Sequence, residues 1–258
     1  MAGLRFAILG SGSRGNATLI DDGRTRILID CGFNLGETER RLERLGVAPG
    51  SLSAIVVTHE HGDHVRGAGM LARRHGIPVW MTPGTRAALP ARIAATMPEP
   101  ERYDPHTPFA IDGLSLHPLP VPHDAREPSQ FVVTDGAHRL GVLSDAGHIT
   151  QHMVACLSGL DALLLEANHD PDMLAEGPYP AALKLRVGGS LGHLSNHQSA
   201  QLLGAVDTSR LRHVVLTHLS EQNNTPERAR GVAAEALGCT PDWLGVAYQD
   251  DGLAWRAV

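Results

Sequence analysis

The chain has 258 residues, of which 42 % are hydrophobic and 19 % are charged, and its formal net charge is −6 at pH 7. This length is within the range of a single large α/β domain with a sizeable core, and the composition is ordinary for a soluble globular protein. The negative charge argues against a broad basic surface for nucleic acid, although 22 Lys and Arg residues leave room for a local groove.

Cysteine usage and the N-terminus bear on the compartment. Cys31, Cys156 and Cys239 lie far apart and form no Cys-x-x-Cys pair, so we expect no disulfide framework. The first nine residues lack the length and flanks of a signal peptide, and no stretch approaches the length of a transmembrane helix. We therefore expect a cytoplasmic protein with no membrane partner and no obligate protein partner.

Apolar periodicity predicts the elements of the N-terminal half. The expected strands are 4–9, 17–20, 26–29, 54–57 and 77–81. The expected helices are 36–45, 67–75 and 83–89. Residues 10–16 form a Gly-rich loop between two strands, and residues 90–109 are rich in Pro, Thr and charge and are predicted to be irregular.

The C-terminal half reads as strands alternating with helices. The expected strands are 114–119, 129–134, 139–143, 161–165 and 212–216, followed by a closing strand pair near 244–256. The expected helices are 149–158, 180–187, 197–205 and 226–237, with Ser195 or Asn196 as the N-cap of the third. No repeat or linker interrupts the chain, so we expect one domain over residues 1–258.

The segment His59–His64 carries three histidines and an aspartate directly after a predicted strand. Imidazole and carboxylate groups are the ligands that Zn²⁺ and related divalent metals take in proteins. In such a loop His59 and His61 can face one metal, while Asp63 and His64 face a second. A solvated polar loop gives no reason for this spacing, so the segment predicts half of a two-metal site.

Two coordination shells need about three more protein ligands. His123, Asp145 and His218 each follow a predicted strand, where loops can gather beside the first motif. His169 is a rival for the last position, but Glu166 has the better claim to that loop.

The pattern His-x-His-x-Asp-His at 59–64 resembles the signature of the metallo-β-lactamase superfamily. The resemblance implies an α/β fold, the four-layer αββα sandwich, with metals at one edge of its two sheets. The ligands it implies are His59, His61 and His123 for one metal, Asp63, His64 and His218 for the second, and Asp145 as a bridge. It also implies that Asp30 supports the metal loop through hydrogen bonds.

Further stretches resemble the YycJ/WalJ family within this superfamily. They are Gly10–Ile20, Pro122–Ala125, Ser144–Gly147, Leu164–Asp170, Gly192–Asn196 and Leu216–Asn224. That family is associated with metal-dependent nuclease activity, including exonuclease action on DNA. It is related to ribonuclease Z and to phosphodiesterases of cyclic phosphates.

Similarity to the ribonuclease Z group implies catalytic roles for Glu166 and His193 beside Asp63. A histidine near the leaving oxygen can donate a proton, and a carboxylate partner keeps it charged and oriented. We expect a metal-bridging hydroxide to attack phosphorus while His193, backed by Glu166, protonates the leaving oxygen. Ser11 or Ser13 is a candidate for holding a neighbouring phosphate.

The sequence thus predicts a binuclear phosphodiesterase or nuclease that degrades DNA from an end, with Zn²⁺ by default and Mn²⁺ or Fe²⁺ as alternatives. The large cap of some superfamily nucleases and the basic arm of ribonuclease Z are absent, which disfavours RNA processing. A hydrolase of small cyclic phosphodiesters remains open. So does a thioester or lactone hydrolase, which would not need an acid at His193. A non-enzymatic scaffold is disfavoured because every catalytic position is filled.

Overall fold

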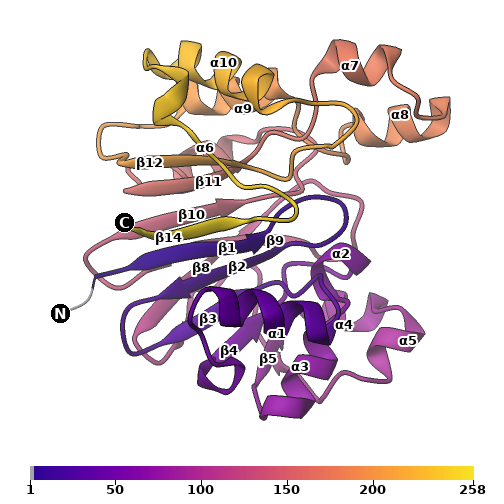
Figure 1. Ribbon diagram of the computed structural model, residues 1–258, viewed down its shortest axis with the longest axis vertical. Coiled ribbons are helices and arrows are strands. Elements are labelled where there is room, and N and C mark those ends of the chain that lie inside the picture. The colour runs from indigo at the N-terminus through magenta and orange to yellow at the C-terminus, as the bar shows by residue number, and fades with distance from the viewer. Residues whose placement is uncertain (1–2) are drawn as a thin grey trace.

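Two sheets of seven strands each pack face to face, and helices cover both outer faces (Figure 1). The computed structural model describes residues 3–258. The four layers confirm the predicted αββα sandwich. Among the described residues, none of the helices combines the length and the apolar character that a membrane crossing requires. All three cysteines are free thiols.

The first sheet is built from the N-terminal half of the chain and the last strand. Its order is β14 (Leu253–Ala257), β1 (Arg5–Gly10), β2 (Ala17–Asp21), β3 (Arg26–Ile29), β4 (Ala54–Val56), β5 (Val79–Met81) and β6 (Glu101–Arg102). Strands β14 to β3 pair antiparallel, and β3 to β6 pair parallel. The carboxyl ends of the parallel strands therefore meet at one edge of this sheet.

The second sheet has the same design with later segments of the chain. Its order is β13 (Gly245–Val246), β12 (His213–Thr217), β11 (Ala162–Glu166), β10 (Arg139–Leu143), β9 (Ser129–Thr134), β8 (Leu114–Pro120) and β7 (Phe109–Ile111). Strands β10 to β13 pair parallel, and β7 to β10 pair antiparallel. This sheet, too, presents the carboxyl ends of parallel strands at one edge.

The helices lie outside the two sheets or at the loop edge. They are α1 (Leu35–Arg44), α2 (Gly62–Val65), α3 (Ala68–His75), α4 (Pro83–Ala88), α5 (Ala91–Ala94), α6 (Gln151–Cys156), α7 (Pro171–Glu176), α8 (Ala181–Val187), α9 (Asn196–Ala205) and α10 (Pro226–Leu237), with short 3₁₀ turns at Pro49–Ser51 and Pro241–Trp243. Ser195 caps α9 in a capping box with Gln198, one of the two caps expected.

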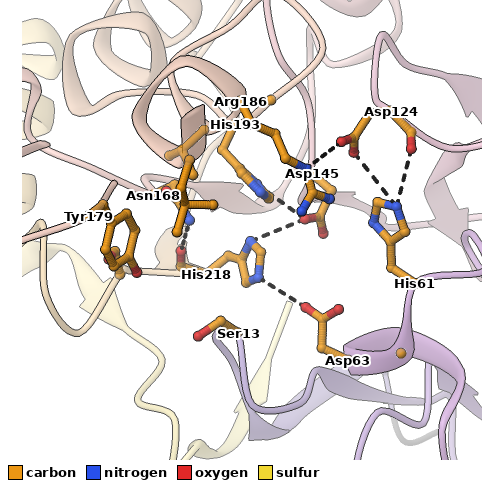
Figure 2. A pocket seen from close by; sticks show the side chains of 15 residues that line it. Ser13, His61, Asp63, Asp124, Asp145, Asn168, Tyr179, Arg186, His193 and His218 are labelled. Carbon is orange, nitrogen blue, oxygen red and sulfur yellow. Dashed lines mark hydrogen bonds and ion pairs between the residues drawn. The ribbon is translucent and has the colours of Figure 1, made fainter. Parts of the chain in front are cut away.

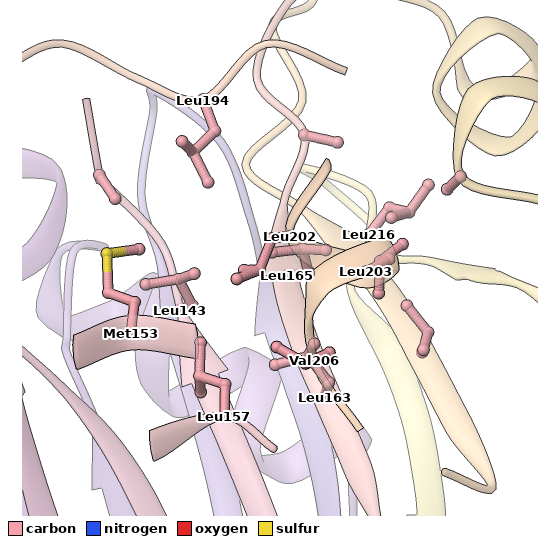
Figure 3. Packing of buried hydrophobic residues seen from close by; sticks show 14 of the residues in the cluster. Leu143, Met153, Leu157, Leu163, Leu165, Leu194, Leu202, Leu203, Val206 and Leu216 are labelled. Atoms are coloured by element: carbon pink, nitrogen blue, oxygen red, sulfur yellow. The ribbon is translucent and has the colours of Figure 1, made fainter. Parts of the chain in front are cut away.

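Three hydrophobic clusters fill the three spaces between the four layers. Side chains alternate across each strand, so neighbours on β11 serve different clusters. Leu163 and Leu165 face the cluster under the C-terminal helices, shown in Figure 3, whereas Leu164 faces the space between the sheets. Both faces of each sheet are therefore buried, and the packed sheets hold the loops at their edge in fixed places.

Most predicted elements are present within one or two residues of their expected bounds. The closing strand pair is a correction: β13 joins the second sheet and β14 the first, so the two strands do not pair along their length. Residues 90–109 are more regular than expected, since they contain α5, β6 and the start of β7. The short helices α2 and α7 were not expected.

Candidate metal centre

The candidate ligands follow strands of both sheets. In the first sheet, β3 leads to Asp30 and β4 leads to the segment His59–His64. In the second, β10 leads to Asp145, β11 ends at Glu166, and β12 leads to His218. Because these are the parallel strands of each sheet, their carboxyl ends bring the loops together.

Three residues of this edge have a left-handed backbone that side-chain-bearing residues seldom adopt. The φ angles are 62° at Asp30, 55° at Asp145 and 54° at His218. Each such residue costs on the order of 1–3 kcal/mol, and these conformations concentrate at functional sites. The turns at Asp145 and His218 place a carboxylate and an imidazole among the candidate ligands, and the turn at Asp30 places a carboxylate behind His64.

A first group of nitrogens comes from His59, His61 and His123. His59 Nε2 is buried and has no hydrogen-bond partner. His61 Nδ1 lies 3.2 Å from His123 Nε2. Two nitrogens bound to one tetrahedral metal at about 2.0–2.1 Å would lie roughly 3.3 Å apart, so this spacing fits a shared ion.

A second group comes from Asp63, His64 and His218. Asp63 Oδ2 lies 3.4 Å from His64 Nε2 and 3.6 Å from His218 Nε2. His218 Nε2 is also buried without a hydrogen-bond partner. Asp145 lies between the groups, because its Oδ2 is 3.0 Å from His64 Nε2 and it shares a third cluster with His59 and His64.

Each of these five histidines has one ring nitrogen turned into the site and the other held by a protein oxygen. The outward contacts are His59 Nδ1 to Thr58 Oγ1 (2.9 Å), His61 Nε2 to Asp124 O (3.2 Å), His64 Nδ1 to Asp30 Oδ2 (2.7 Å), His123 Nδ1 to Gly192 O (3.0 Å) and His218 Nδ1 to Glu166 Oε1 (3.2 Å). With the outer nitrogen donating, the inner one presents a lone pair. This is the arrangement found around metal-ligating histidines.

The donor set therefore fits divalent metal: imidazole nitrogens and carboxylate oxygens converge, and two buried nitrogens have no other partner. Asp30 contributes from outside. It accepts hydrogen bonds from the Thr58 backbone N–H (2.8 Å) and Thr58 Oγ1 (2.9 Å) as well as from His64. It thus holds the start of the histidine loop, in the place the sequence predicts.

The buried Glu166 and the half-buried His193 form a pair beside Asp145 (Figure 2 shows His193). His193 Nδ1 lies 2.8 Å from Glu166 Oε1 and 3.2 Å from Asp145 Oδ1. Burial by itself lowers the pKa of His193, but the Glu166 and Asp145 carboxylates outweigh it and raise the pKa to about 10. Burial raises the pKa of Glu166, and the charge and hydrogen bond of His193 reverse this and lower it to about 2. The pair is therefore an imidazolium and a carboxylate at neutral pH.

A cavity of about 430 Å³ opens over these groups. Asp63, Asp145, His193 and His218 line it together with Ser13 and Arg186 (Figure 2). This volume is within the range of small-ligand sites. A substrate group in the cavity would contact both ligand groups and the imidazolium of His193.

The structure brings together every predicted ligand, with Asp30, Glu166 and His193 around them. His169 lies apart: it joins none of the ligand groups, and its Nδ1 faces Asn168 Oδ1 at 3.4 Å. Of the two candidate serines, Ser11 is buried and its Oγ accepts the backbone N–H of His218 (2.8 Å). Ser13 lines the cavity.

Several contributors were not expected. Asn16 Nδ2 lies 3.3 Å from Asp63 Oδ2 and 3.1 Å from His64 Nε2, so it borders the second group of candidate ligands. In the sequence, the one indication of a role for Asn16 is its position in the Gly-rich loop of residues 10–16. Tyr179 and Arg186 line the cavity from the α7–α8 region, where the sequence carries no metal-binding pattern.

The chain matches one protein-family model and is similar in sequence to two named bacterial proteins. The family model described as "Beta-lactamase superfamily domain" matches residues 25–219. The exodeoxyribonuclease YycJ of Bacillus anthracis is 31 % identical over 252 residues, which cover 96 % of this chain and 94 % of that protein. The exodeoxyribonuclease WalJ of Streptococcus pneumoniae strain D39 is 28 % identical over 96 % of this chain and 93 % of that protein.

Solved structures agree on the fold. The metallo-β-lactamase fold protein YhfI from Bacillus subtilis superposes with a TM-score of 0.74, covering 98 % of this chain and 99 % of that chain at 16 % identity. The likeness covers both sheets and the helices outside them.

Proposed function

This chain belongs to the beta-lactamase superfamily, and from that premise we propose that it is a binuclear metal-dependent nuclease that degrades DNA from an end. The observation that carries the proposal is the His193–Glu166 pair beside two converging groups of metal-binding side chains. The exodeoxyribonuclease relatives, similar along nearly the whole chain, support DNA as the substrate. Both sheets supply the site, which supports one working domain.

We assign seven residues to two divalent metals. They are His59, His61 and His123 for one ion, Asp63, His64 and His218 for the other, and Asp145 for both. When bound, such a pair supplies Lewis acidity towards a phosphodiester and lowers the pKa of a bound water. The ligand types suit Zn²⁺, and Mn²⁺ or Fe²⁺ also bind histidine with carboxylate.

Side chains of the protein donate the proton and orient the reacting groups. Glu166 Oε1 accepts from His193 Nδ1, which turns the other edge of the imidazolium towards the cavity. From there His193 donates its Nε2 proton to the leaving oxygen. Glu166 keeps the ring charged before the transfer and oriented after it. Asp63 and Asp145 lie beside the imidazoles of His64 and His218 and would share the two ions with them.

The test is hydrolysis of end-labelled single- and double-stranded DNA, beside bis-p-nitrophenyl phosphate, by metal-analysed protein with Mn²⁺ and Zn²⁺ added separately. We expect stepwise shortening of DNA from one end. Asp145→Ala should lose activity and bound metal together, while Asp242→Ala, an exposed aspartate outside the cavity, should keep both.

The other results would identify the alternatives. Hydrolysis of the model ester without any shortening of DNA would indicate a small-molecule phosphodiesterase. Activity on neither, together with activity on thioesters or lactones, would contradict the phosphodiester assignment. Full activity of Asp145→Ala with unchanged metal content would contradict its place between the two ions.

A further inference from the structure

One tyrosine lines the cavity beside the candidate ligands. Tyr179 is the only Tyr, Phe or Trp among the described residues that line it. The chain has only ten such residues in all (four Phe, three Trp and three Tyr), so an aromatic ring at this place is not expected from composition. Figure 2 shows it beyond Asn168, on the side of the cavity away from His61.

The ring of Tyr179 makes no aromatic contact, and its hydroxyl makes no hydrogen bond, with any residue in the part of the chain that the structure describes. Tyr103 shows the contrast. Its hydroxyl donates to Val57 O (3.0 Å), and its ring stacks on Phe109 with centroids 5.0 Å apart. Tyr103 belongs to the core, whereas Tyr179 is half-buried and presents its ring to the cavity.

The backbone around Tyr179 is stiff although little of it is buried. The residue lies between Pro178 and Pro180, in the connection from α7 to α8. Each proline ring fixes its own φ and restricts the residue before it. Helix α8 has no buried residue, so packing alone does not explain why this arm lines the cavity. A stiff arm presents an aromatic ring at a low entropic cost to a ligand.

We propose that Tyr179 is a stacking platform for the base of the nucleotide next to the scissile phosphodiester. The inference rests on the proposed nuclease function and names how the site holds its substrate. Every base has a π face, so stacking on Tyr179 would bind nucleotides of any sequence. Such stacking changes affinity by roughly 10- to 100-fold per base. It also suits a negatively charged protein, because it needs no broad basic surface.

The experiment uses two labelled oligonucleotides that differ only in the terminal nucleotide, which is either normal or abasic, at the end that wild-type protein degrades. We expect wild-type protein to cleave the abasic end roughly 10- to 100-fold less efficiently in kcat/KM. Tyr179→Ala should lose the same factor on the normal end and nothing more on the abasic end. Tyr179→Phe keeps the ring and should retain the wild-type preference.

A second measurement does not depend on turnover. With metal-loaded protein and an oligonucleotide whose terminal linkages resist hydrolysis, a terminal 2-aminopurine should lose fluorescence when bound to wild-type protein or Tyr179→Phe, and not when Tyr179→Ala is added. Tyr248→Ala, which removes an exposed tyrosine outside this cavity, is the matched control and should behave as wild type. Thermal melting of each variant shows whether it is folded.

The outcomes separate the two proposals. If wild-type protein degrades normal and abasic ends equally fast, the stacking inference is overturned and the nuclease function stands. If Tyr179→Ala loses the same factor on both ends, its role is structural and the inference is again overturned. If wild-type protein neither binds nor degrades either oligonucleotide, the proposed function fails and the inference with it.

Discussion

Two buried carboxylates set the geometry of the candidate site, one from each sheet. Asp30 holds His64 directly and reaches His59 through Thr58. Glu166 holds His193 and His218 through one oxygen, while its other oxygen accepts the backbone N–H groups that follow Asp145 and His193. Fixing the outer nitrogens in this way orients the inner ones before any metal binds.

Asp30→Asn tests this role, because asparagine tolerates the left-handed backbone at this position. The substitution removes the charge that accepts from Thr58 and His64. We expect metal affinity to fall by about 10–100-fold while the fold persists. Competition with a chelator of known affinity measures it, with Asp242→Asn as the control of the same type. Unchanged affinity would contradict a supporting role for Asp30.

His193→Ala tests the proton donor. Loss of a general acid should reduce kcat for phosphodiester hydrolysis by about 10²–10⁴-fold, with metal content unchanged, because we assign no metal to this residue. Glu166→Gln should lower both kcat and metal affinity, since Glu166 also holds His218. A loss of metal in His193→Ala, or undiminished phosphodiester hydrolysis, would show that His193 is not the acid.

At the scale of elements, the loops of the second sheet are joined by a pair of buried amides. Asn196, at the start of α9, and Asn224, after β12, exchange hydrogen bonds of 2.9 and 2.8 Å. Asn224 Nδ2 also donates to Ala167 O, just after β11. The Asn224 side chain therefore fixes the spacing of α9, β11 and the loop after β12, which lie next to His193, Glu166 and His218.

Asn224→Asp should break this junction, because a carboxylate cannot donate to Asn196 Oδ1 or Ala167 O. We expect a loss of about 1–3 kcal/mol in the free energy of unfolding, measured by urea denaturation. Gln222→Glu makes the same change at an exposed position of the same loop and should cost little. Equal stability of both variants would contradict the role of the amide pair.

A second junction ties three strands of the first sheet. Asp21, at the end of β2, is 1 % exposed and pairs with Arg5 of β1 (2.7 Å) and Arg26 of β3 (2.8 Å). Burial raises its pKa, but the hydrogen bonds from both arginines outweigh burial and hold the pKa below the usual value of 3.8. The carboxylate therefore stabilises the fold above the unfolded-state pKa, and this contribution is lost as the pH falls through the lower folded-state value.

Asp21→Asn should accordingly destabilise the protein at pH 7 by about 1–2 kcal/mol. The difference in unfolding free energy between wild type and variant should shrink below about pH 4, where the unfolded carboxyl is protonated. Urea titrations at pH 7, 5 and 3.5 measure it. A difference that does not change with pH would mean that packing, and not charge, accounts for the effect.

At the scale of the whole molecule, the site joins the two halves of the sandwich. His59, His61, Asp63 and His64 come from the first sheet, whereas Asp145 and His218 come from the second. Anything that binds the folded site and not the unfolded chain stabilises the fold by mass action. Bound metal should therefore stabilise the packing of the two sheets as well as take part in catalysis.

Removal of metal should lower the melting temperature. At free metal 100-fold above Kd the stabilisation is about 2.7 kcal/mol, which corresponds to roughly 5–10 °C for a chain of this size. Calorimetry with EDTA and then with returned Zn²⁺ or Mn²⁺ measures the shift. Asp145→Ala should show little response to metal, and a full response would contradict its assignment to both ions.

The sequence by itself determined which residues are candidates for the site and the order of most elements. The spacing from His59 to His64 is local, and hydrophobic periodicity is local as well, so both can be read along the chain. Asp145 and His218 could be predicted as candidate ligands because each follows a clear apolar strand. The resemblance to a known family then supplied the αββα arrangement, which the family comparison confirms.

Only the tertiary structure decided how these residues face one another. It settled which nitrogen of each histidine points inward, since that depends on oxygens as distant in sequence as Gly192 is from His123. It placed β13 and β14 in different sheets, because such short strands carry too little pattern to choose a partner. It also brought Tyr179 over the cavity. Each of these is a contact between distant segments, and packing of the whole chain selects such contacts, whereas local propensity does not.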